Sequence, residues 1–350
     1  MSMKPAGGAN YQPVRDFVSK LGNGWNLGNT LDAVASKPSA TVAASETAWG
    51  NPVTTKEMID TVAMAGFEVL RVPVTWDGHF GPGPDYTIDE KWLERVAEVV
   101  DYGLDNKMTV ILNLHHEEWH FPSEENYEKA SGILKKLWAQ IAKRFENYGE
   151  NLIFEAMNEP RMKGTAFEWN GGNPEGRDIV NRLNADFVNV IRQSGGNNPA
   201  RHLMLPTYAA SSDEKAMAAF KMPKDDNIIV SIHSYTPYLF ALSEEDVREW
   251  SAANPNDTRD LINLFRLLDK YFLSKGFPVI LGEMGSRNRS ENTQARTALA
   301  EYYANLAKTH SVPLVWWDNG IVKGNGELFG LLDRRQLEWF YPTIVEAMTK

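Results

Sequence analysis

The sequence predicts an α/β protein with the architecture of a (β/α)8 TIM barrel, formed as a single domain by residues 1–350. Eight short apolar segments rich in Val, Ile and Leu alternate with longer segments of helical spacing. No low-complexity stretch that resembles a linker divides them. The apolar segments alternate only weakly, which is typical of strands buried on both faces of a parallel sheet.

The predicted strands follow one another at intervals that leave room for a helix after each, as a barrel of this kind requires. In chain order they are residues 22–29 (GNGWNLGN), 68–74 (EVLRVPV), 108–114 (MTVILNL), 151–157 (NLIFEAM), 201–208 (RHLMLPTY), 227–233 (NIIVSIH), 277–283 (FPVILGE) and 312–317 (VPLVWW). A doubly wound open sheet is the alternative, but no glycine-rich nucleotide loop follows an early strand.

Amphipathic helices are predicted between these strands. Residues 55–65 and 90–105 each place their apolar side chains on one face, and Asp89 is a capping candidate for the second of them. Residues 133–145 and 261–272 repeat the pattern. We interpret residues 1–15 as a lead outside the barrel, either flexible or introduced by cloning.

Composition excludes several classes of function. The formal net charge is −10 and the pI about 5.3, so the protein would repel phosphate backbones and anionic lipids, and we expect neither nucleic-acid nor membrane binding. The chain has no cysteine, which excludes disulfides, thiolate metal sites and a cysteine nucleophile. It has no apolar run of about 18 residues, and its first ten residues lack the apolar core of a signal peptide.

Polar and aromatic residues gather where the predicted strands end, which is where the active site of a TIM barrel lies. Taken alone, each of them has an ordinary structural explanation, such as a surface ion pair or a core indole. Their common position on one rim predicts an active site instead. In strand order they are Arg71, His115, His116, Asn158, Glu159, His233, Tyr235, Glu283, Trp316 and Trp317.

Glu159 and Glu283 would face each other across the barrel mouth, as cleavage of a glycosidic bond requires. One carboxylic acid must protonate the leaving oxygen, while the other, ionised, attacks the anomeric carbon or activates water. We expect Arg71 to favour the charged form of Glu283. Burial opposite a second carboxylate is expected to raise the pKa of Glu159.

Other rim residues fit the same reaction. Tyr235 and Arg71 could hold the nucleophile, Asn158 could bond the 2-hydroxyl of the sugar, and indoles could stack on pyranose faces. Glu155 precedes Glu159 by four residues, about 13 Å in an extended strand, and shares its parity. We interpret Glu155 as a structural group paired with a buried cation such as Arg71, and not as a sugar contact.

An ordered set of motifs resembles glycoside hydrolase family 5, and its opening resembles the bacterial endoglucanase branch of cellulases, lichenases and xyloglucanases. The motifs are GWNLGNTLDA at 24–33, ETAWGNP at 46–52, RVPVTW at 71–76, ILNLHHE at 111–117, FEAMNEP at 154–160, HSYTPY at 233–238, LGEMGS at 281–286, WWDNG at 316–320 and LFGLLDR at 328–334.

The resemblance implies a retaining endo-β-1,4-glucanase that hydrolyses cellulose-type or mixed-linkage β-glucan by double displacement. It implies Glu159 as acid/base and Glu283 as nucleophile. The supporting residues would be Arg71, His115, Asn158, His233, Tyr235 and Trp317. The expected substrate contacts are Asn26, His116, Trp49, Trp119 and Trp316. It further implies a secreted monomer with β-glucan as its partner, and neither a cofactor nor a metal.

Three alternatives remain open. Xyloglucan or mannan could be the substrate, because loops such as 79–87 and 164–178 decide which polymer fits. A metal-dependent barrel hydrolase could use His115, His116, His233 and a carboxylate, although adjacent histidines on a strand tend to point to opposite faces. A carbohydrate-binding barrel without catalysis would be expected to have lost one glutamate, and both are present.

Overall fold

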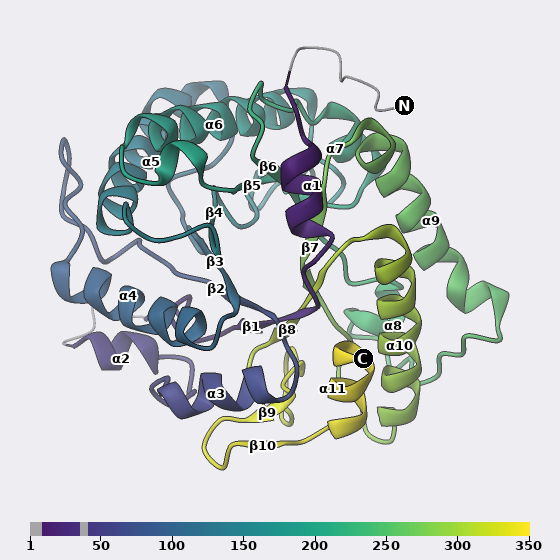
Figure 1. Cartoon of the computed structure of the whole chain (residues 1–350). Coiled ribbons are helices and arrows are strands. Elements are labelled where there is room, and N and C mark those ends of the chain that lie inside the picture. The colour runs from purple at the N-terminus through teal and green to yellow at the C-terminus, as the bar shows by residue number, and fades with distance from the viewer. Residues whose placement is uncertain (1–8, 36–40) are drawn as a thin grey trace.

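Eight parallel strands close into a barrel in the order of the chain, with β8 pairing back to β1 (Figure 1). The computed structural model describes residues 9–35 and 41–350. The predicted fold class is therefore confirmed. The barrel strands are β1 (Gly24–Leu27), β2 (Val69–Val72), β3 (Thr109–Asn113), β4 (Leu152–Glu155), β5 (Leu203–Ser211), β6 (Ile228–His233), β7 (Val279–Met284) and β8 (Leu314–Asp318).

Helices surround the strands, as Figure 1 shows. They are α1 (Gln12–Val18), α2 (Val42–Glu46), α3 (Lys56–Met64), α4 (Glu90–Asp105), α5 (Glu124–Arg144), α6 (Pro174–Gln193), α7 (Glu214–Ala219), α8 (Tyr238–Ala241), α9 (Pro255–Tyr271), α10 (Thr293–His310) and α11 (Pro342–Thr349), with the 3-10 turns η1 (Asn198–Ala200) and η2 (Leu273–Lys275). A short antiparallel pair, β9 (Leu332–Asp333) and β10 (Glu338–Trp339), precedes α11.

Side-chain caps fix where the long helices begin. The carboxylate of Asp89 accepts hydrogen bonds from the first amides of α4, as predicted, and Ser123 caps α5 in the same way. Asn173 and Asn254 cap α6 and α9, and a proline follows each of them. These local signals let each helix begin at a defined distance from the strand that precedes it.

The apolar core forms two layers. One lies between the strands and the surrounding helices, and the other fills the lower part of the barrel. The inner layer takes one side chain from most strands: Val69, Ile111, Ile153, Met204, Ile229, Ile280 and Val315. Inward and outward residues alternate along each strand, so the inner layer follows from strand parity.

Helix α1 closes the N-terminal end of the barrel, where Figure 1 shows it in front of the strands. Its Val14 and Val18, with the preceding Tyr11, are buried against the inner core layer. The prediction that residues 1–15 form a lead outside the barrel is therefore wrong for residues 11–15, because apolar side chains there cover the barrel floor. Residues 1–8 lie outside the described residues.

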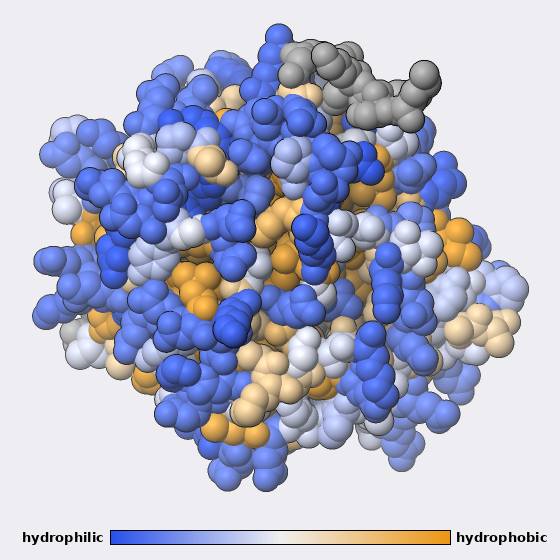
Figure 2. Space-filling model, viewed as in Figure 1, coloured by the Kyte–Doolittle hydropathy of each residue, from blue (hydrophilic) through white to orange (hydrophobic). Residues whose placement is uncertain are grey.

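The face seen in Figure 1 is hydrophilic over most of its area, with smaller apolar areas between (Figure 2). A hollow of about 700 Å³ at this end lies between α10, α11 and the segment after α1. Gly22, Glu68 and Pro313, which lie before β1, β2 and β8, line it. It is therefore at the opposite end from the predicted site, and none of its described lining residues was predicted to belong to that site.

Across the described ranges, no helix combines the length and the apolar character that crossing a membrane requires.

Candidate active site

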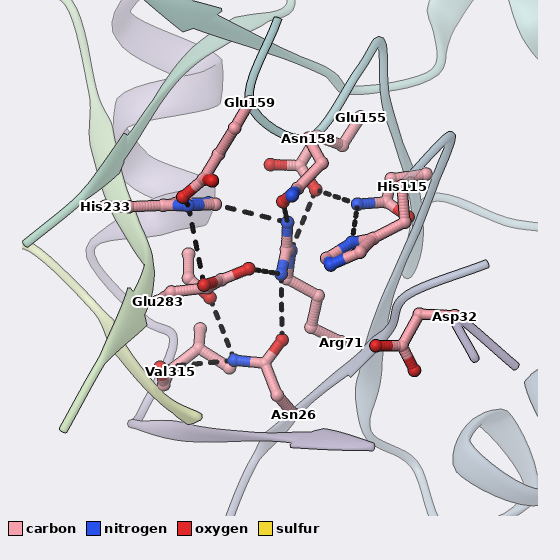
Figure 3. A network of polar contacts seen from close by, with 12 residues as sticks. Asn26, Asp32, Arg71, His115, Glu155, Asn158, Glu159, His233, Glu283 and Val315 are labelled. Carbon is pink, nitrogen blue, oxygen red and sulfur yellow. Dashed lines mark hydrogen bonds and ion pairs between the residues drawn. The ribbon is translucent and has the colours of Figure 1, made fainter. Parts of the chain in front are cut away.

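Arg71 lies at the centre of a polar network at the carboxyl ends of the strands (Figure 3). It is fully buried, and it donates from Nε to Glu155 and from Nη1 to Glu283, each at 2.8 Å. Burial alone would lower the pKa of the guanidinium, but the charges of Glu155 and Glu283 raise it above its ordinary value. The cation is therefore permanent and neutralises two carboxylates that burial would otherwise make costly.

Two asparagines complete the coordination of Arg71. Asn26 on β1 accepts from Nη1 at 3.0 Å, and Asn158 after β4 accepts from Nη2 at 2.8 Å. The amide of Asn26 donates in turn to the backbone oxygen of Gly282 at 2.9 Å. Asn26 is fully buried, so its prediction as a substrate contact is wrong. It holds Arg71 because β1 places it inside the barrel.

Glu283 is held at the end of β7 by two donors. Its Oε1 accepts from Arg71, and its Oε2 accepts from the hydroxyl of Tyr235 at 2.9 Å. Burial and the charge of Glu283 raise the pKa of Tyr235 well above its ordinary value, so the phenol keeps the proton that it donates. Both oxygens of Glu283 are thus fixed in direction, as the sequence predicted for this pair of donors.

Glu159 lies in the loop after β4, and its Oε1 is 2.8 Å from His233 Nδ1. His233 Nε2 is 3.4 Å from Arg71 Nη2, so the partners assign the proton to Nδ1 and an acceptor role to Nε2. Burial pushes the pKa of Glu159 up, but the hydrogen bond from His233, together with the charge of Arg161, lowers it below its ordinary value. The prediction that the pKa of Glu159 is raised is therefore wrong, because the sequence did not show which donors face this carboxylate.

The two proposed catalytic carboxylates lie close together. A carboxylate oxygen of Glu159, a ring nitrogen of His233 and a carboxylate oxygen of Glu283 all lie within 4.8 Å of one another. Carboxylates about 5 Å apart are typical of retaining glycosidases, whereas inverting enzymes leave room for a water molecule at about 6.5–9.5 Å. The geometry is thus suited to direct attack by a carboxylate.

Glu155 reaches the same network from below. Its Oε1 accepts from Ser231 at 2.6 Å, and its Oε2 accepts from Asn113 at 3.1 Å and from Arg71. The pairing with Arg71 agrees with the sequence interpretation. The predicted separation of about 13 Å between Glu155 and Glu159 assumed one extended strand. It does not apply, because β4 ends at Glu155 and the chain turns before Glu159.

His115 and Trp317 form one wall of the site. Their rings are stacked, with centroids 5.6 Å apart and planes 2° from parallel. His115 Nδ1 lies 3.1 Å from the side-chain nitrogen of Asn113. Burial lowers the pKa of His115 well below its ordinary value, so the ring is neutral. The structure brings both residues to the rim, as predicted.

The predicted indole contacts divide into two groups. Trp316 is 1% exposed, and its indole nitrogen donates to the backbone oxygen of Phe329 at 3.0 Å. Trp119 is 8% exposed and donates to Glu117 at 2.6 Å. The prediction that Trp316 contacts substrate is wrong, because its ring packs in the core. Trp119 is slightly more exposed than Glu283 and remains a predicted contact. In contrast, Trp49 is 38% exposed.

Trp49 and His116 lie next to each other at the surface. Their ring centroids are 5.5 Å apart, and the side chain of His116 is also 38% exposed. The indole nitrogen of Trp49 donates to the backbone oxygen of Val34 at 3.0 Å, which fixes the ring in place. Both residues remain predicted substrate contacts.

Two groups of side chains have the residue types of a metal site. One is Asp32 with His115 and His116, and the other is Glu159 with His233 and Glu283. The expectation that the adjacent histidines point apart is wrong, since their ring centroids are 4.5 Å apart. β3 ends at Asn113, so strand alternation does not extend to them.

Sequence reasoning missed Asn113, Ser231 and Arg161. Asn113 and Ser231 have the strand parity of the inward residues Ile111 and Ile229, which is a signal that could have identified them. Arg161 lies in a loop and gave no such signal.

Comparison with known proteins places the chain among cellulases. Residues 33–322 match the family described as Cellulase (glycosyl hydrolase family 5). Endoglucanase A of Ruminococcus albus is 44% identical over 337 residues, which cover 95% of this chain and 91% of that protein. Endoglucanase A of Clostridium longisporum is 44% identical over 98% of this chain, but the chain spans only 66% of that protein.

Solved structures of similar proteins agree with this family assignment. A lichenase of family 5 from Caldicellulosiruptor sp. F32, in complex with cellotetraose, superposes with a TM-score of 0.92 at 43% identity, covering 99% of this chain and 96% of that one. A broad-specificity endoglucanase from Ruminococcus champanellensis with bound cellotriose gives 0.93 at 44% identity, covering 100% and 99%. A xyloglucan-specific endo-β-1,4-glucanase from a metagenomic library gives 0.92 at 40% identity, covering 97% and 99%.

Proposed function

The chain belongs to glycosyl hydrolase family 5, and on that premise we propose that it is a retaining endo-β-1,4-glucanase acting on cellulose-type or mixed-linkage β-glucan. The observation that carries the proposal is the placement of Glu159 and Glu283, since one oxygen of each carboxylate lies within 4.8 Å of the other. Separate partners hold them: His233 for Glu159, and Arg71 with Tyr235 for Glu283.

In the first step, Glu283 attacks the anomeric carbon while Glu159 protonates the leaving oxygen. Arg71 and Tyr235 hold the two oxygens of Glu283 in a fixed direction, so little reorganisation is needed as the carboxylate bonds the anomeric carbon and the bond to the leaving oxygen breaks. A bound sugar covers Glu159 and excludes water. Exclusion of water adds to the effect of burial, which favours the protonated form, and so opposes the donors that hold the pKa of Glu159 below its ordinary value.

In the second step, water replaces Glu283 at the anomeric carbon. The glycosyl ester has removed the negative charge of Glu283, so the neighbouring Glu159 ionises more readily. Glu159 then accepts the proton from water, and His233 donates to the resulting carboxylate. One residue can therefore serve as acid and then as base.

The family relatives support the substrate class. The relatives named endoglucanase, and the neighbours named lichenase and broad-specificity endoglucanase, are similar over nearly the whole chain. Xyloglucan is the second candidate, favoured by the similarity to a xyloglucan-specific enzyme, and mannan is the third. Turnover on a panel of mixed-linkage glucan, carboxymethylcellulose, xyloglucan and mannan, with sizing of the products, separates these polymers.

The variants Glu283→Gln and Glu159→Gln test the mechanism. Both should lose turnover of soluble β-glucan by about 10³-fold or more in a folded protein. On an aryl glycoside with a good leaving group, Glu159→Gln should still form the glycosyl-enzyme, because that bond needs little protonation, whereas Glu283→Gln should not. Near wild-type turnover of β-glucan by either variant would refute the assignment.

Chelation and product release test the two other classes of function. A metal-dependent hydrolase built on His115, His116 and His233 would lose activity after exhaustive chelation, whereas catalysis by two carboxylates would not. A carbohydrate-binding barrel would release no reducing ends from β-glucan.

We also propose that residues 1–350 form one catalytic domain, because all eight strands contribute to a single closed barrel, and that the protein works as a monomer. Since polymeric β-glucan cannot enter a cell, secretion is proposed as well. Size-exclusion chromatography with light scattering tests the monomer, and assay of culture medium against cell contents tests secretion.

A further inference from the structure

Arg296 on α10 is a fully buried cation without an acidic partner. Its side chain has no solvent exposure, and it forms no ion pair with any Asp or Glu of the described residues. Burial lowers the pKa of Arg296 to about 10, so the guanidinium is still charged at neutral pH. A charge in the interior is costly unless a partner offsets it, so the surroundings of this side chain need an explanation.

The guanidinium of Arg296 uses only one of its three nitrogens for a hydrogen bond within the described ranges. Nε donates to the backbone oxygen of Ser286 at 3.1 Å. Nη1 and Nη2 are buried, and neither has a hydrogen-bond partner among the residues that the structure describes. Buried donors are nearly always satisfied in folded proteins, because a lost hydrogen bond is not replaced by water there. These two nitrogens therefore indicate an acceptor that the chain itself does not supply.

The hydroxyl of Ser286 lies beside this guanidinium and also lacks a partner. Ser286 follows β7 and has no solvent exposure, and its Oγ has no hydrogen bond in the described part of the chain. Because Nε of Arg296 contacts the backbone oxygen of the same residue, the hydroxyl and the guanidinium belong to one polar cluster. A hydroxyl can donate, so one acceptor between the two side chains would satisfy both.

The groups around Arg296 offset its charge only in part. The guanidinium carbon lies 4.5 Å from the ring centroid of Tyr341 and 5.9 Å from that of Trp316, which are cation–π distances. Tyr341 and Asp318 favour the charged form of Arg296, but neither forms a hydrogen bond with Nη1 or Nη2. Asp318 is already paired with Arg334 and accepts from backbone amides.

Two further arginines of the same segment add positive charge. Arg287 and Arg289 are 9% and 8% exposed, and both donate to the backbone oxygen of Ser243. Neither forms an ion pair with a carboxylate of the described ranges. The charge of Arg289 lowers the pKa of Arg296, as expected when two cations lie near each other. Residues 286–296 therefore hold three largely buried cations, and their combined field favours an anion over a neutral water molecule as the missing acceptor.

We propose that Arg296 and Ser286 bind a small monovalent anion of the halide class, for which chloride is the common member. Nη1 and Nη2 of Arg296 and the hydroxyl of Ser286 would donate to it. A monatomic anion accepts from several directions at once, and the full burial of both residues favours it over a larger oxyanion. The inference goes beyond the proposed function, because it concerns an ion held between the barrel wall and α10 and not the hydrolysis of a glycosidic bond.

Anion binding would stabilise the folded protein, since the unfolded chain has no such site. The melting temperature should rise by about 2 °C for each tenfold increase in chloride above the dissociation constant. The measurement is a series of thermal melts between about 3 mM and about 300 mM chloride, with sodium gluconate keeping the ionic strength constant. A melting temperature that does not depend on chloride in the wild type would overturn the proposal.

The variants Arg296→Met and Ser286→Ala test the residues, with Arg201→Met as the matched control. Arg201 is also buried, and burial lowers its pKa to about 10. All three of its guanidinium nitrogens, however, donate to oxygens of the chain, including those of Leu152 and Tyr148. Arg201→Met should lower the melting temperature at every chloride concentration and keep the wild-type chloride dependence.

Arg296→Met should lose the chloride dependence. Ser286→Ala removes only a hydroxyl and is expected to fold. It should raise the chloride concentration needed for the same stabilisation about tenfold, because it deletes one hydrogen bond to a charged group. A wild-type chloride dependence in either variant, or its loss in Arg201→Met as well, would overturn the assignment.

Crystals soaked in sodium bromide locate the ion directly. We expect an anomalous peak within hydrogen-bond distance of Arg296 and Ser286 in the wild type and none there in Arg296→Met. A water molecule in that place, with no anomalous signal, would overturn the proposal. A bromide peak without any chloride dependence of the melting temperature would show an adventitious ion only and would overturn it too.

Discussion

Arg71 and Glu155 form an ion pair of 2.8 Å in which both side chains are fully excluded from solvent. The pair lies beneath the proposed nucleophile, and the same guanidinium donates to Glu283. Glu155 therefore determines how Arg71 is oriented. β4 ends at Glu155, and Glu159 lies in the loop that follows. The two glutamates of residues 151–160 have different environments, and only Glu159 is partly exposed.

Glu155→Gln should destabilise the protein more than it damages the chemistry. Removing one partner of a buried ion pair costs about 3 kcal/mol, because the other charge is left uncompensated. We expect the free energy of unfolding in guanidinium chloride to fall by about this amount, while some turnover of β-glucan remains.

Glu214→Gln is the control for this change, because Glu214 pairs with Lys270 at the surface and its loss should leave unfolding unchanged. An unaltered unfolding curve for Glu155→Gln, or a loss of turnover as complete as that of Glu159→Gln, would contradict the structural role.

Trp49→Ala should weaken substrate binding without slowing the chemistry. The ring is exposed beside His116, and its indole nitrogen donates to the backbone oxygen of Val34. We expect KM for β-glucan to rise about threefold to tenfold and kcat to stay within about twofold. This is the pattern expected when the lost contact binds the substrate and the transition state equally well. Phe340→Ala, at an exposed aromatic residue just before α11, is the control. An unchanged KM would remove Trp49 from the substrate contacts.

The neighbouring tryptophans of β8 should respond differently to the same substitution. Trp316→Phe leaves the buried oxygen of Phe329 without its donor and should lower the free energy of unfolding by about 2 kcal/mol, with kcat/KM nearly unchanged. Trp317→Phe changes the ring stacked on His115 and should lower kcat/KM about tenfold with less effect on unfolding. Thermal melts and initial rates measured on both variants test this; equal effects would argue against the assignment.

Glu117 should make the protein less stable as the pH rises. Burial raises the pKa of Glu117 to about 8, although hydrogen bonds from the Trp76 amide and the Trp119 indole lower it. The folded state therefore holds a proton that the unfolded chain releases above about pH 4.5. The contribution of this protonated carboxyl group to stability is complete below about pH 4.5. It is lost as the pH rises toward 8, and the free energy of unfolding falls by about 1.4 kcal/mol per pH unit.

The experiment is urea unfolding at pH 5, 6, 7 and 8 for the wild type and Glu117→Gln. The variant should show the flatter dependence, because its amide does not titrate. Asp32, whose pKa burial raises to about 6, adds a slope of the same sign to both proteins. Parallel dependences would show that Glu117 does not titrate in this range.

The sequence was sufficient to predict the barrel and its reactive end. Strand and helix periods are local properties, so eight apolar segments with helices between them already indicate the fold. Parallel strands in a barrel all end at one rim, so the position of Arg71, Glu159 and Glu283 at the carboxyl ends of three different strands was enough to predict that they meet.

The tertiary structure decided what each side chain contacts. Parity in a strand distinguishes inward from outward residues only while the strand lasts, and β3 and β4 end before His115 and Glu159. Beyond those points the chain turns, which brings His115 against His116 and Glu159 against His233 and Arg161. The exposure of Trp49 and the burial of Trp316 depend likewise on neighbours distant in the chain, so no local pattern could distinguish a substrate contact from a core indole.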